Sequence, residues 1–330
     1  MWKDMYRILC VVNNTSDAMA YYRSSLPMVR MSQEYNNIEV DFISPSMNPK
    51  WDLLSRYNVC FSQRPDSDRH VDFLSKCKMH KLKIWMDFDD AFWHVTPDSP
   101  AFGYYGSDKA TKAIRECIDL ADRITVSTVA LSESIKTMFN RDSDVIKNAI
   151  DIAGMQYLSP LKNQSNNVTW RGSHTHQKDL LQSQADIIEV DSRHDLRWTF
   201  MGYNPWMISE KLKNAVHIDY FDEITVYLET LRRMDGNIMI VPLVENPFNR
   251  CKSNIAGLES IICGMLPVVP AWWSDLDVLG AGSFVENLEK LIGMDEKTKN
   301  MFHRELLTHV RDQYSLVNAN ALRYEVLQDL

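Results

Sequence analysis

The sequence predicts an α/β protein with two Rossmann-like domains, each built on a parallel sheet. Short apolar runs alternate with longer amphipathic stretches, which is typical of βαβ units. This alternation occurs twice, and a polar, turn-rich stretch at residues 150–168 separates the two series. The chain has 330 residues, whereas a single domain usually has about 100–200. We therefore expect domains at residues 1–160 and 161–314, followed by a helix at 315–330.

The length and composition of each apolar run predict the individual strands. A run of roughly four to eight apolar residues bounded by polar turns indicates a buried strand. In the first half, these runs lie at residues 7–12, 38–43, 59–63, 83–87, 124–127 and 144–147. In the second half, they lie at residues 168–170, 198–202, 215–218, 238–241 and 266–269. Amphipathic periodicity predicts helices at residues 109–121, 130–139 and 298–330.

Functional residues are expected directly after the strands. The carboxyl ends of parallel strands meet at one edge of a sheet, and open α/β sheets bind their ligands there. Two such sheets that face each other would place both edges around one interdomain cleft.

Composition and charge limit the classes of function. Hydrophobic residues make up 45% and charged residues 24% of the chain, as in ordinary globular proteins. The formal net charge of −8 argues against a surface dominated by nucleic-acid binding, but it leaves room for a local basic groove. The six cysteines are widely spaced, which predicts reduced thiols, a cytoplasmic location and no zinc site. The apolar run at residues 8–12 is too short for a signal peptide or a membrane span.

The most informative segment is residues 240–270, IVPLVENPFNRCKSNIAGLESIICGMLPVVP. It predicts a strand, a loop, a helix that begins near Ser253, a left-handed helix end at Gly264, and another strand. Lys252 and free N–H groups at a helix start suit a diphosphate. The Glu259 carboxylate, two turns further on, could accept the hydroxyls of a ribose. The alternative interpretation is that Lys252 and Glu259 are solvated residues at the edge of an amphipathic helix.

This segment resembles the donor site of GT-B glycosyltransferases, particularly the family 4-like group of phage and bacterial type. The group's pattern reads approximately PL…N.FN..KS..K.LE…G.PVV. The matching residues are Pro242, Leu243, Asn246, Phe248, Asn249, Lys252, Ser253, Leu258, Glu259, Gly264, Pro267, Val268 and Val269. The resemblance implies that Lys252 and Ser253 hold the donor diphosphate, that Glu259 holds the ribose, and that Asn249 also belongs to the donor site. Ala256 stands where the group has a second lysine, so one charge contact is missing.

A sequence motif at the start of the second half also resembles this group. Residues 170–180, WRGSHTHQKDL, resemble its W.GS.TH..DL pattern. Gly172 and Ser173 would then let the backbone approach the donor phosphates, and Arg171 or Lys178 would supply positive charge. The HTH sequence at residues 174–176 could alternatively hold a metal, but two histidines without further ligands are a weak metal signal.

Four sequence motifs in the first half also resemble the group. Residues 85–100, WMDFDDAFWHVTPDSP, place Asp87, Asp89 and Asp90 at a strand end. We expect Asp89 on the acceptor side and Asp90 in a catalytic role, with domain packing and helix capping as the alternatives. Arg23, in the motif YRSSLP, would reach the acceptor or the donor phosphates across the cleft, or form a structural ion pair.

The words ADRITVST and VIKNAID, at residues 121–128 and 145–151, match the last two N-terminal strands of the group. These two motifs help to locate the strands and carry no predicted site residue. In GT-B enzymes the last helix commonly returns to the N-terminal domain, which the resemblance implies for residues 315–330.

The resemblance implies transfer of a hexosyl or pentosyl group from a nucleoside-diphosphate sugar to an acceptor hydroxyl, with retention. Lys252, the helix start at Ser253, and Arg171 or Lys178 would assist departure of the diphosphate. No prosthetic group and no metal are expected. The acceptor would be a glycan, a small molecule or modified DNA.

Two alternatives keep the fold, and a third does not. One is a phage-type enzyme that glycosylates a hydroxymethylated base in DNA, and another is a non-catalytic nucleotide-binding scaffold. A Rossmann dehydrogenase is disfavoured because Asn13-Asn14-Thr15 follows the first strand in place of a glycine-rich turn.

Overall fold

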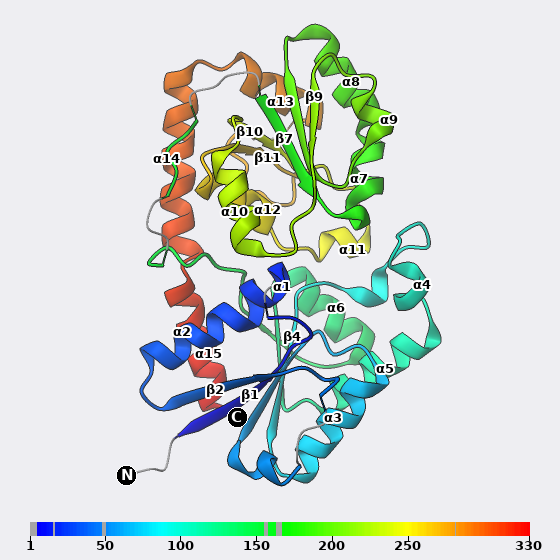
Figure 1. The fold of residues 1–330 in the computed structure, drawn as a ribbon, viewed down its shortest axis with the longest axis vertical. Helices are drawn as coiled ribbons and strands as arrows, with labels where there is room; N and C mark the ends of the chain where they lie inside the picture. Colours follow the sequence, from blue (N-terminus) through cyan, green and yellow to red (C-terminus); the bar gives the residue numbers. More distant parts are fainter. Residues whose placement is uncertain (1–4, 16, 48–50, 155–157, 163–166, 281) are drawn as a thin grey trace.

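The computed structural model describes residues 5–15, 17–47, 51–154, 158–162, 167–280 and 282–330. It contains two separate parallel sheets, stacked end to end and each covered by helices (Figure 1). The predicted α/β architecture with two Rossmann-like sheets is therefore confirmed.

The N-terminal sheet has the order β2-β1-β3-β4-β5-β6, and all its pairings are parallel. Its strands are β1 (Tyr6–Val11), β2 (Ile38–Ile43), β3 (Val59–Gln63), β4 (Lys83–Phe88), β5 (Arg123–Val126) and β6 (Asp144–Val145). Strands β3 and β4 are buried almost throughout, because helices cover both faces of the sheet.

The C-terminal sheet has the order β11-β10-β7-β8-β9, again all parallel. Its strands are β7 (Asn167–Gly172), β8 (Arg197–Gly202), β9 (Ala215–Ile218), β10 (Ile238–Ile240) and β11 (Leu266–Val268). Every predicted strand is confirmed to within two residues at each end. The prediction succeeds because a strand buried on both faces must be apolar at consecutive positions.

The helices follow the strands in βα order. Those between the N-terminal strands are α1 (Ala18–Ala20), a π-helical turn (Tyr21–Ser25), α2 (Leu26–Glu34), α3 (Asp68–Met79), α4 (Phe102–Tyr105), α5 (Asp108–Leu120) and α6 (Val129–Phe139). Those of the second half are α7 (Gln177–Gln182), α8 (Gln184–Arg193), α9 (Trp206–Ser209), α10 (Ile224–Arg233), α11 (Pro247–Arg250), α12 (Ile255–Ile262), α13 (Phe284–Gly293) and α14 (Glu296–Gln313). The last helix is α15 (Leu316–Gln328), and short 3-10 turns lie at Trp51–Arg56, Phe92–His94 and His174–His176. None of the described helices is both long enough and apolar enough to span a bilayer.

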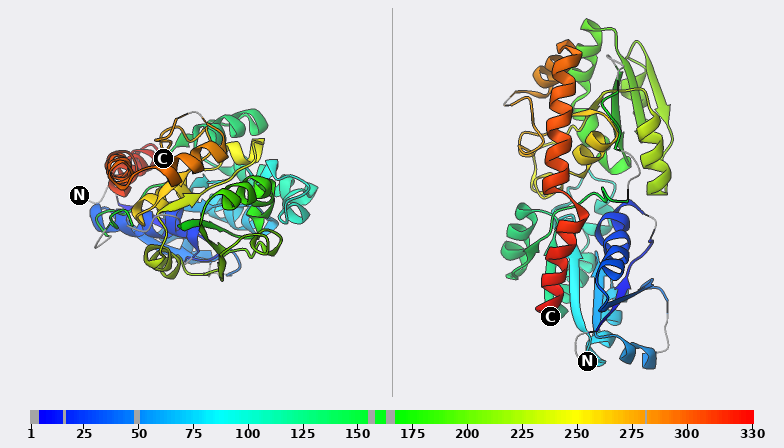
Figure 2. Two further views of the ribbon diagram at one scale, coloured as in Figure 1. Left: turned by 90° about the horizontal axis from the view of Figure 1, so that it is seen from above. Right: turned by 90° about the vertical axis from the view of Figure 1, so that its left-hand side faces the viewer.

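The chain crosses between the two halves at two adjacent points. The N–H of Ile150 donates to the carbonyl of Tyr314 at 2.7 Å, and the N–H of Leu316 donates to the carbonyl of Ile150 at 2.9 Å. After the second crossing, α15 packs against α2 and the first N-terminal strands, where Tyr324 stacks on Tyr35 at 4.1 Å between ring centroids. Figure 2 shows α14 and α15 running along one side of both halves. We retain 160/161 and 314/315 as the proposed domain limits; residues 155–157 and 163–166 of the predicted linker lie outside the described residues.

The carboxyl ends of the two sheets face each other across the interface (Figure 1). Helix α11, which follows β10, packs on the 3-10 turn Phe92–His94, which follows β4. The buried side chain of Cys251 joins the apolar core of the N-terminal half, and the hydroxyl of Thr128 donates to its carbonyl at 2.8 Å. All six cysteines are free and buried.

Candidate nucleotide-sugar site

The start of α12 lies at the domain interface, behind the carboxyl end of β10. The helix begins at Ile255 with Asn254 as its N-cap, one residue later than the sequence suggested. The predicted cap, Ser253, has its Oγ 2.7 Å from the Nδ2 of Asn148, so it is engaged by the other domain. The N–H groups of the first helical turn have no acceptor within the helix, so they are available to an anion. The predicted left-handed end is confirmed at Gly264, whose φ is +81°.

Lys252 is an uncompensated cation at this helix start. Among the described residues it makes no ion pair, and its Nζ lies 4.7 Å from the centre of the Phe248 ring. Its charge reaches His176, whose pKa is lowered first by burial and then by Lys252. Because the N-terminus of a helix carries a partial positive charge of its own, this corner is well suited to a diphosphate.

Glu259 is enclosed, and its carboxylate is already occupied by protein donors. Its side chain is 3% exposed. Oε1 accepts from the hydroxyl of Tyr22 at 2.9 Å, and Oε2 accepts from the hydroxyl of Tyr227 at 2.8 Å and from Arg171. A carboxylate offers about four lone-pair sites. Three are taken, so the predicted two-hydroxyl contact with a ribose does not fit this conformation.

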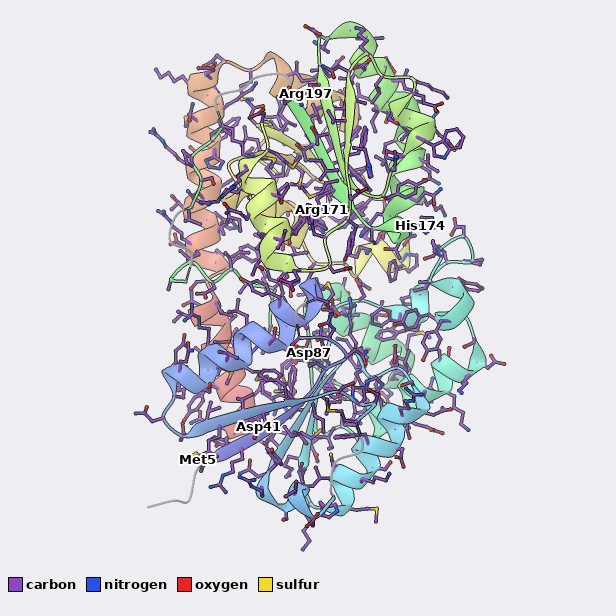
Figure 3. All side chains as sticks on the ribbon, viewed as in Figure 1. Met5, Asp41, Asp87, Arg171, His174 and Arg197 are labelled. Carbon is purple, nitrogen blue, oxygen red and sulfur yellow. The ribbon has the colours of Figure 1, made fainter. Side chains whose placement is uncertain are left out.

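Arg171, predicted as a free phosphate-binding cation, is instead the ion-pair partner of Glu259. Burial is the largest single influence and opposes its charge, but the attraction of Glu259 together with Tyr227 and Tyr22 outweighs it, so the pKa of Arg171 is raised. The guanidinium also lies over the ring of Tyr227 at 5.9 Å. Figure 3 shows Arg171 at the edge of the C-terminal sheet that faces Asp87 in the other half. Because Arg171 is paired with Glu259, its positive charge is already partly neutralised within the protein.

The turn after β7 brings backbone close to this corner. Gly172 pairs with Gly202 of β8, whose φ is +101°. A Cβ at Gly172 would meet the Trp170 ring at 2.7 Å, and one at Gly202 would meet the Gly172 carbonyl oxygen at 2.3 Å. Ser173 follows, with its Oγ 2.8 Å from the Oγ1 of Thr175. Both glycines are thus required by close packing.

Two further residues predicted at the donor site have structural partners. Lys178 forms an ion pair with Asp98 of the N-terminal half, and this contact lowers the pKa of Asp98. Asn249 is buried and donates to Asp179 at 2.7 Å and to the carbonyl of Val244 at 2.9 Å. These contacts hold the interface and the loop after β10, so both side chains already have protein partners in this conformation.

The residue that holds this loop in place is Asp179, which the sequence reasoning did not single out. Besides Asn249, its Oδ1 accepts from the N–H of Val244 at 3.0 Å, and its Oδ2 lies 3.6 Å from His176. Its position in the word WRGSHTHQKDL was the available signal. Across the described residues, no group of three or more His, Cys, Asp or Glu side chains is arranged to hold a metal, and His174 and His176 do not form such a site.

The carboxylates after β4 are paired with arginines. Asp89 is buried and accepts from Arg64 at 2.7 Å in a two-pronged ion pair, so its predicted acceptor contact is not available in this conformation. Asp90 lies 3.1 Å from the same guanidinium, and its side chain is 19% exposed. Of the two, Asp90 alone retains an accessible carboxylate.

Arg23 forms the structural ion pair rather than an acceptor contact. It is fully buried, and its Nε and Nη2 donate to the two oxygens of Asp87 at 2.8 and 2.6 Å. Its Nη1 donates to the carbonyl of Ile146 at 2.6 Å and to the Oδ1 of Asn148 at 3.1 Å. Tyr22 and Arg23 are consecutive buried residues of the π-helical turn at Tyr21–Ser25.

No protein-family model matches the chain, and no curated protein matches it in sequence. Solved structures match it over nearly its whole length. An α-glucosyltransferase in complex with UDP-glucose and DNA containing an abasic site has a TM-score of 0.66 at 12% identity, with 98% of this chain and 99% of that chain covered. The trehalose-6-phosphate synthase OtsA has a TM-score of 0.63 at 9% identity, with 98% and 99% covered. HepE of Anabaena in complex with UDP has a TM-score of 0.64 at 10% identity, with 99% and 100% covered.

This chain has the GT-B fold. At these identities the likeness establishes the arrangement of the two sheets, and the family 4-like assignment stays a prediction.

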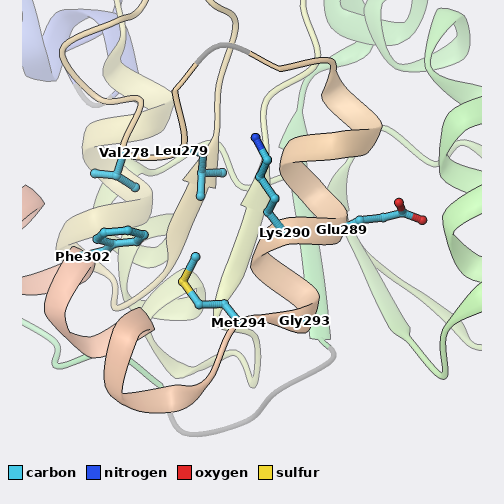
Figure 4. Close-up of a pocket in the computed structure, with 7 residues that line it drawn as sticks. All are labelled: Val278, Leu279, Glu289, Lys290, Gly293, Met294 and Phe302. Carbon is cyan, nitrogen blue, oxygen red and sulfur yellow. The ribbon is translucent and has the colours of Figure 1, made fainter.

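One surface pocket in this GT-B chain lies away from the facing sheet edges. It has a volume of about 450 Å³ and lies between α13, α14 and the loop that contains Val278 and Leu279 (Figure 4). Met294 and Phe302 complete an apolar lining, with Lys290 at the rim. A largely apolar pocket lined by one lysine and one glutamate, Glu289, is poorly suited to a diphosphate, so the corner around Lys252 is the better candidate.

Proposed function

We propose that this protein is a glycosyltransferase that moves a sugar from a nucleoside diphosphate to an acceptor hydroxyl. The observation that carries the proposal is Lys252 at the N-terminus of α12, which makes no ion pair among the described residues and whose charge reaches His176, in the turn after β7. The similarity to a glucosyltransferase bound to UDP-glucose supports a uridine nucleotide as the first donor to test. The cytoplasmic location and the hexosyl or pentosyl donor remain part of this proposal.

In the proposed reaction, the bond between the anomeric carbon and the diphosphate oxygen breaks, and negative charge develops on the leaving group. Lys252 and the N–H groups of α12 would stabilise that charge. One such donor is typically worth about a hundredfold to a thousandfold in rate. Arg171 would contribute less, because Glu259 already takes up part of its charge. The acceptor would approach from the N-terminal half near Asp90, with retention of the anomeric configuration.

Binding of the donor ribose would require a rearrangement at Glu259. Of its three donors, Tyr22 is the one that comes from the other half of the molecule. A buried carboxylate must keep its hydrogen bonds. We propose that a ribose hydroxyl replaces the Tyr22 hydroxyl when the donor enters, so that the charge of Glu259 stays satisfied throughout.

A donor panel tests the proposal. UDP-, GDP- and ADP-sugars would be incubated with glycan, small-molecule and DNA acceptors, and the products read by mass spectrometry. The proposal predicts transfer from at least one donor and its loss in Lys252→Ala, while the exposed control Lys112→Ala keeps activity. Nucleotide binding without transfer to any acceptor would instead support a non-catalytic scaffold.

DNA with a hydroxymethylated base is the second candidate acceptor. The likeness to an α-glucosyltransferase that was solved with DNA favours it, whereas the net charge of −8 counts against it. Binding to a DNA backbone weakens steeply with salt, because counterions are released. A duplex that carries hydroxymethylated bases should therefore bind more weakly as salt rises from about 50 to 200 mM. Binding that is absent, or insensitive to salt, rules out this acceptor.

A further inference from the structure

Asn148 joins the N-terminal ion pair to the start of α12. It lies in the word VIKNAID, directly after β6, and is 1% exposed. One end of its amide meets Arg23 at 3.1 Å, and the other meets the Oγ of Ser253 at 2.7 Å. It is thus a buried bridge between the two halves that ends at the proposed diphosphate position.

The partner on the N-terminal side fixes which way the amide points. A guanidinium has only donors, so the atom of Asn148 that faces Arg23 must be the carbonyl oxygen. Arg23 cannot turn away, because both oxygens of Asp87 hold it and Thr125 in turn donates to Asp87 at 2.7 Å. The NH₂ group of Asn148 must therefore face Ser253.

This orientation determines what Ser253 can do. A serine hydroxyl has one hydrogen to donate and two lone pairs that accept. Because Asn148 donates to Ser253, the oxygen acts as the acceptor in that bond, and the hydroxyl hydrogen is left over. Within the described residues no acceptor takes that hydrogen. A hydroxyl that accepts a hydrogen bond is also polarised into a better donor.

We propose that Asn148 is a positioning residue that turns the Ser253 hydroxyl into a hydrogen-bond donor for a diphosphate oxygen. The inference rests on the proposed function, because it assigns the diphosphate to the start of α12. Arg23 acts one step further back, since it holds the amide of Asn148 in the required orientation.

A double-mutant cycle on diphosphate binding tests this. Asn148→Ala and Ser253→Ala should each weaken UDP and inorganic pyrophosphate by about tenfold, as expected for a hydrogen bond to a charged group. The double variant should lose about the same tenfold, because both changes remove one interaction. Asn148→Asp keeps the shape of the side chain but accepts the Ser253 hydrogen, so it should weaken both ligands at least as much as Asn148→Ala.

The matched control is Lys147→Ala, the neighbouring residue, which is exposed and lies 3.9 Å from Asp275 of the other half. It should leave both affinities unchanged. Two results would overturn the inference: a hundredfold loss in the double variant, or an affinity of Asn148→Ala equal to that of Lys147→Ala. If the wild type still binds UDP in that case, the proposed function stands without the inference. Coupled losses for pyrophosphate without any sugar transfer would support the inference and refute the transferase. Binding of neither ligand by the wild type would refute both.

Discussion

The strand end after β4 and the start of α12 both place charged side chains at a sheet edge, but among the described residues only the start of α12 has a charge without an ion-pair partner. After β4, Asp87 and Asp89 are each held by a buried or half-buried arginine. At α12, Lys252 has no ion-pair partner among the described residues, and the helix adds positive potential.

The difference shows what a charged residue at a strand end means. Buried charges are retained only when they are paired, so a balanced pair is already a complete structure with no need for a ligand. An unbalanced, accessible charge next to unsatisfied N–H groups is the better sign of a ligand site.

Removing a charge from a balanced pair should mainly reduce stability. Asp87→Asn leaves Arg23 buried without its carboxylate, and breaking a buried pair costs about 3–5 kcal/mol. Chemical denaturation would measure the free energy of unfolding. Asp142→Asn, which breaks an exposed pair with Lys136, is the control and should leave the midpoint unchanged. A loss no larger than that of the control would contradict the structural role of Asp87.

Removing the unbalanced charge should instead reduce binding. Lys252→Ala should weaken UDP by about tenfold to hundredfold, the worth of a hydrogen bond to a charged group. The unfolding midpoint should stay at the wild-type value, because Lys252 makes no ion pair among the described residues. Titration calorimetry measures the affinity, with Lys112→Ala as the surface control. A loss of stability without a loss of affinity would reverse the assignment.

Substitution of Tyr22 should increase the affinity for UDP. If a ribose hydroxyl replaces the Tyr22 hydroxyl on Glu259, Tyr22→Phe removes an internal competitor. UDP should then bind about threefold to tenfold more tightly, and pyrophosphate, which lacks a ribose, should bind as before. The neighbouring Tyr21→Phe is the control. Weaker UDP binding in Tyr22→Phe would show that Tyr22 supports the site and does not compete with the ribose.

The smallest expected effect is the pH dependence contributed by His176. Burial and Lys252 lower its pKa below the ordinary value of 6.5. Just below that value the unfolded state binds more protons than the folded state, so this contribution to stability is present above pH 6.5 and is lost as the pH falls. His176→Asn should therefore show a smaller drop in melting temperature between about pH 7.5 and pH 5 than the wild type. The exposed His80→Asn should follow the wild-type profile, and an equal drop in His176→Asn would contradict the shift.

The sequence predicted the features that are local. Strands covered on both faces appear as consecutive apolar residues. Lys252, before the start of α12, and Gly264, just after its end, lie within one continuous segment of the sequence. It did not reveal pairings between residues that are distant in the chain. Arg64, which takes Asp89 and has a φ of +50°, gives no signal of its partner.

Burial of Glu259 was likewise beyond the sequence, because Tyr22 is 237 positions away. The helix starts one residue later than predicted, with Asn254 as its N-cap. Ser253, the predicted cap, is instead bonded to Asn148 of the other half, a partner that the local sequence does not reveal.

A crystal structure with UDP bound would locate the diphosphate. We predict that it lies within hydrogen-bonding distance of the Nζ of Lys252, the Oγ of Ser253 and the first N–H groups of α12. A diphosphate bound elsewhere, such as in the pocket between α13 and α14, would contradict it.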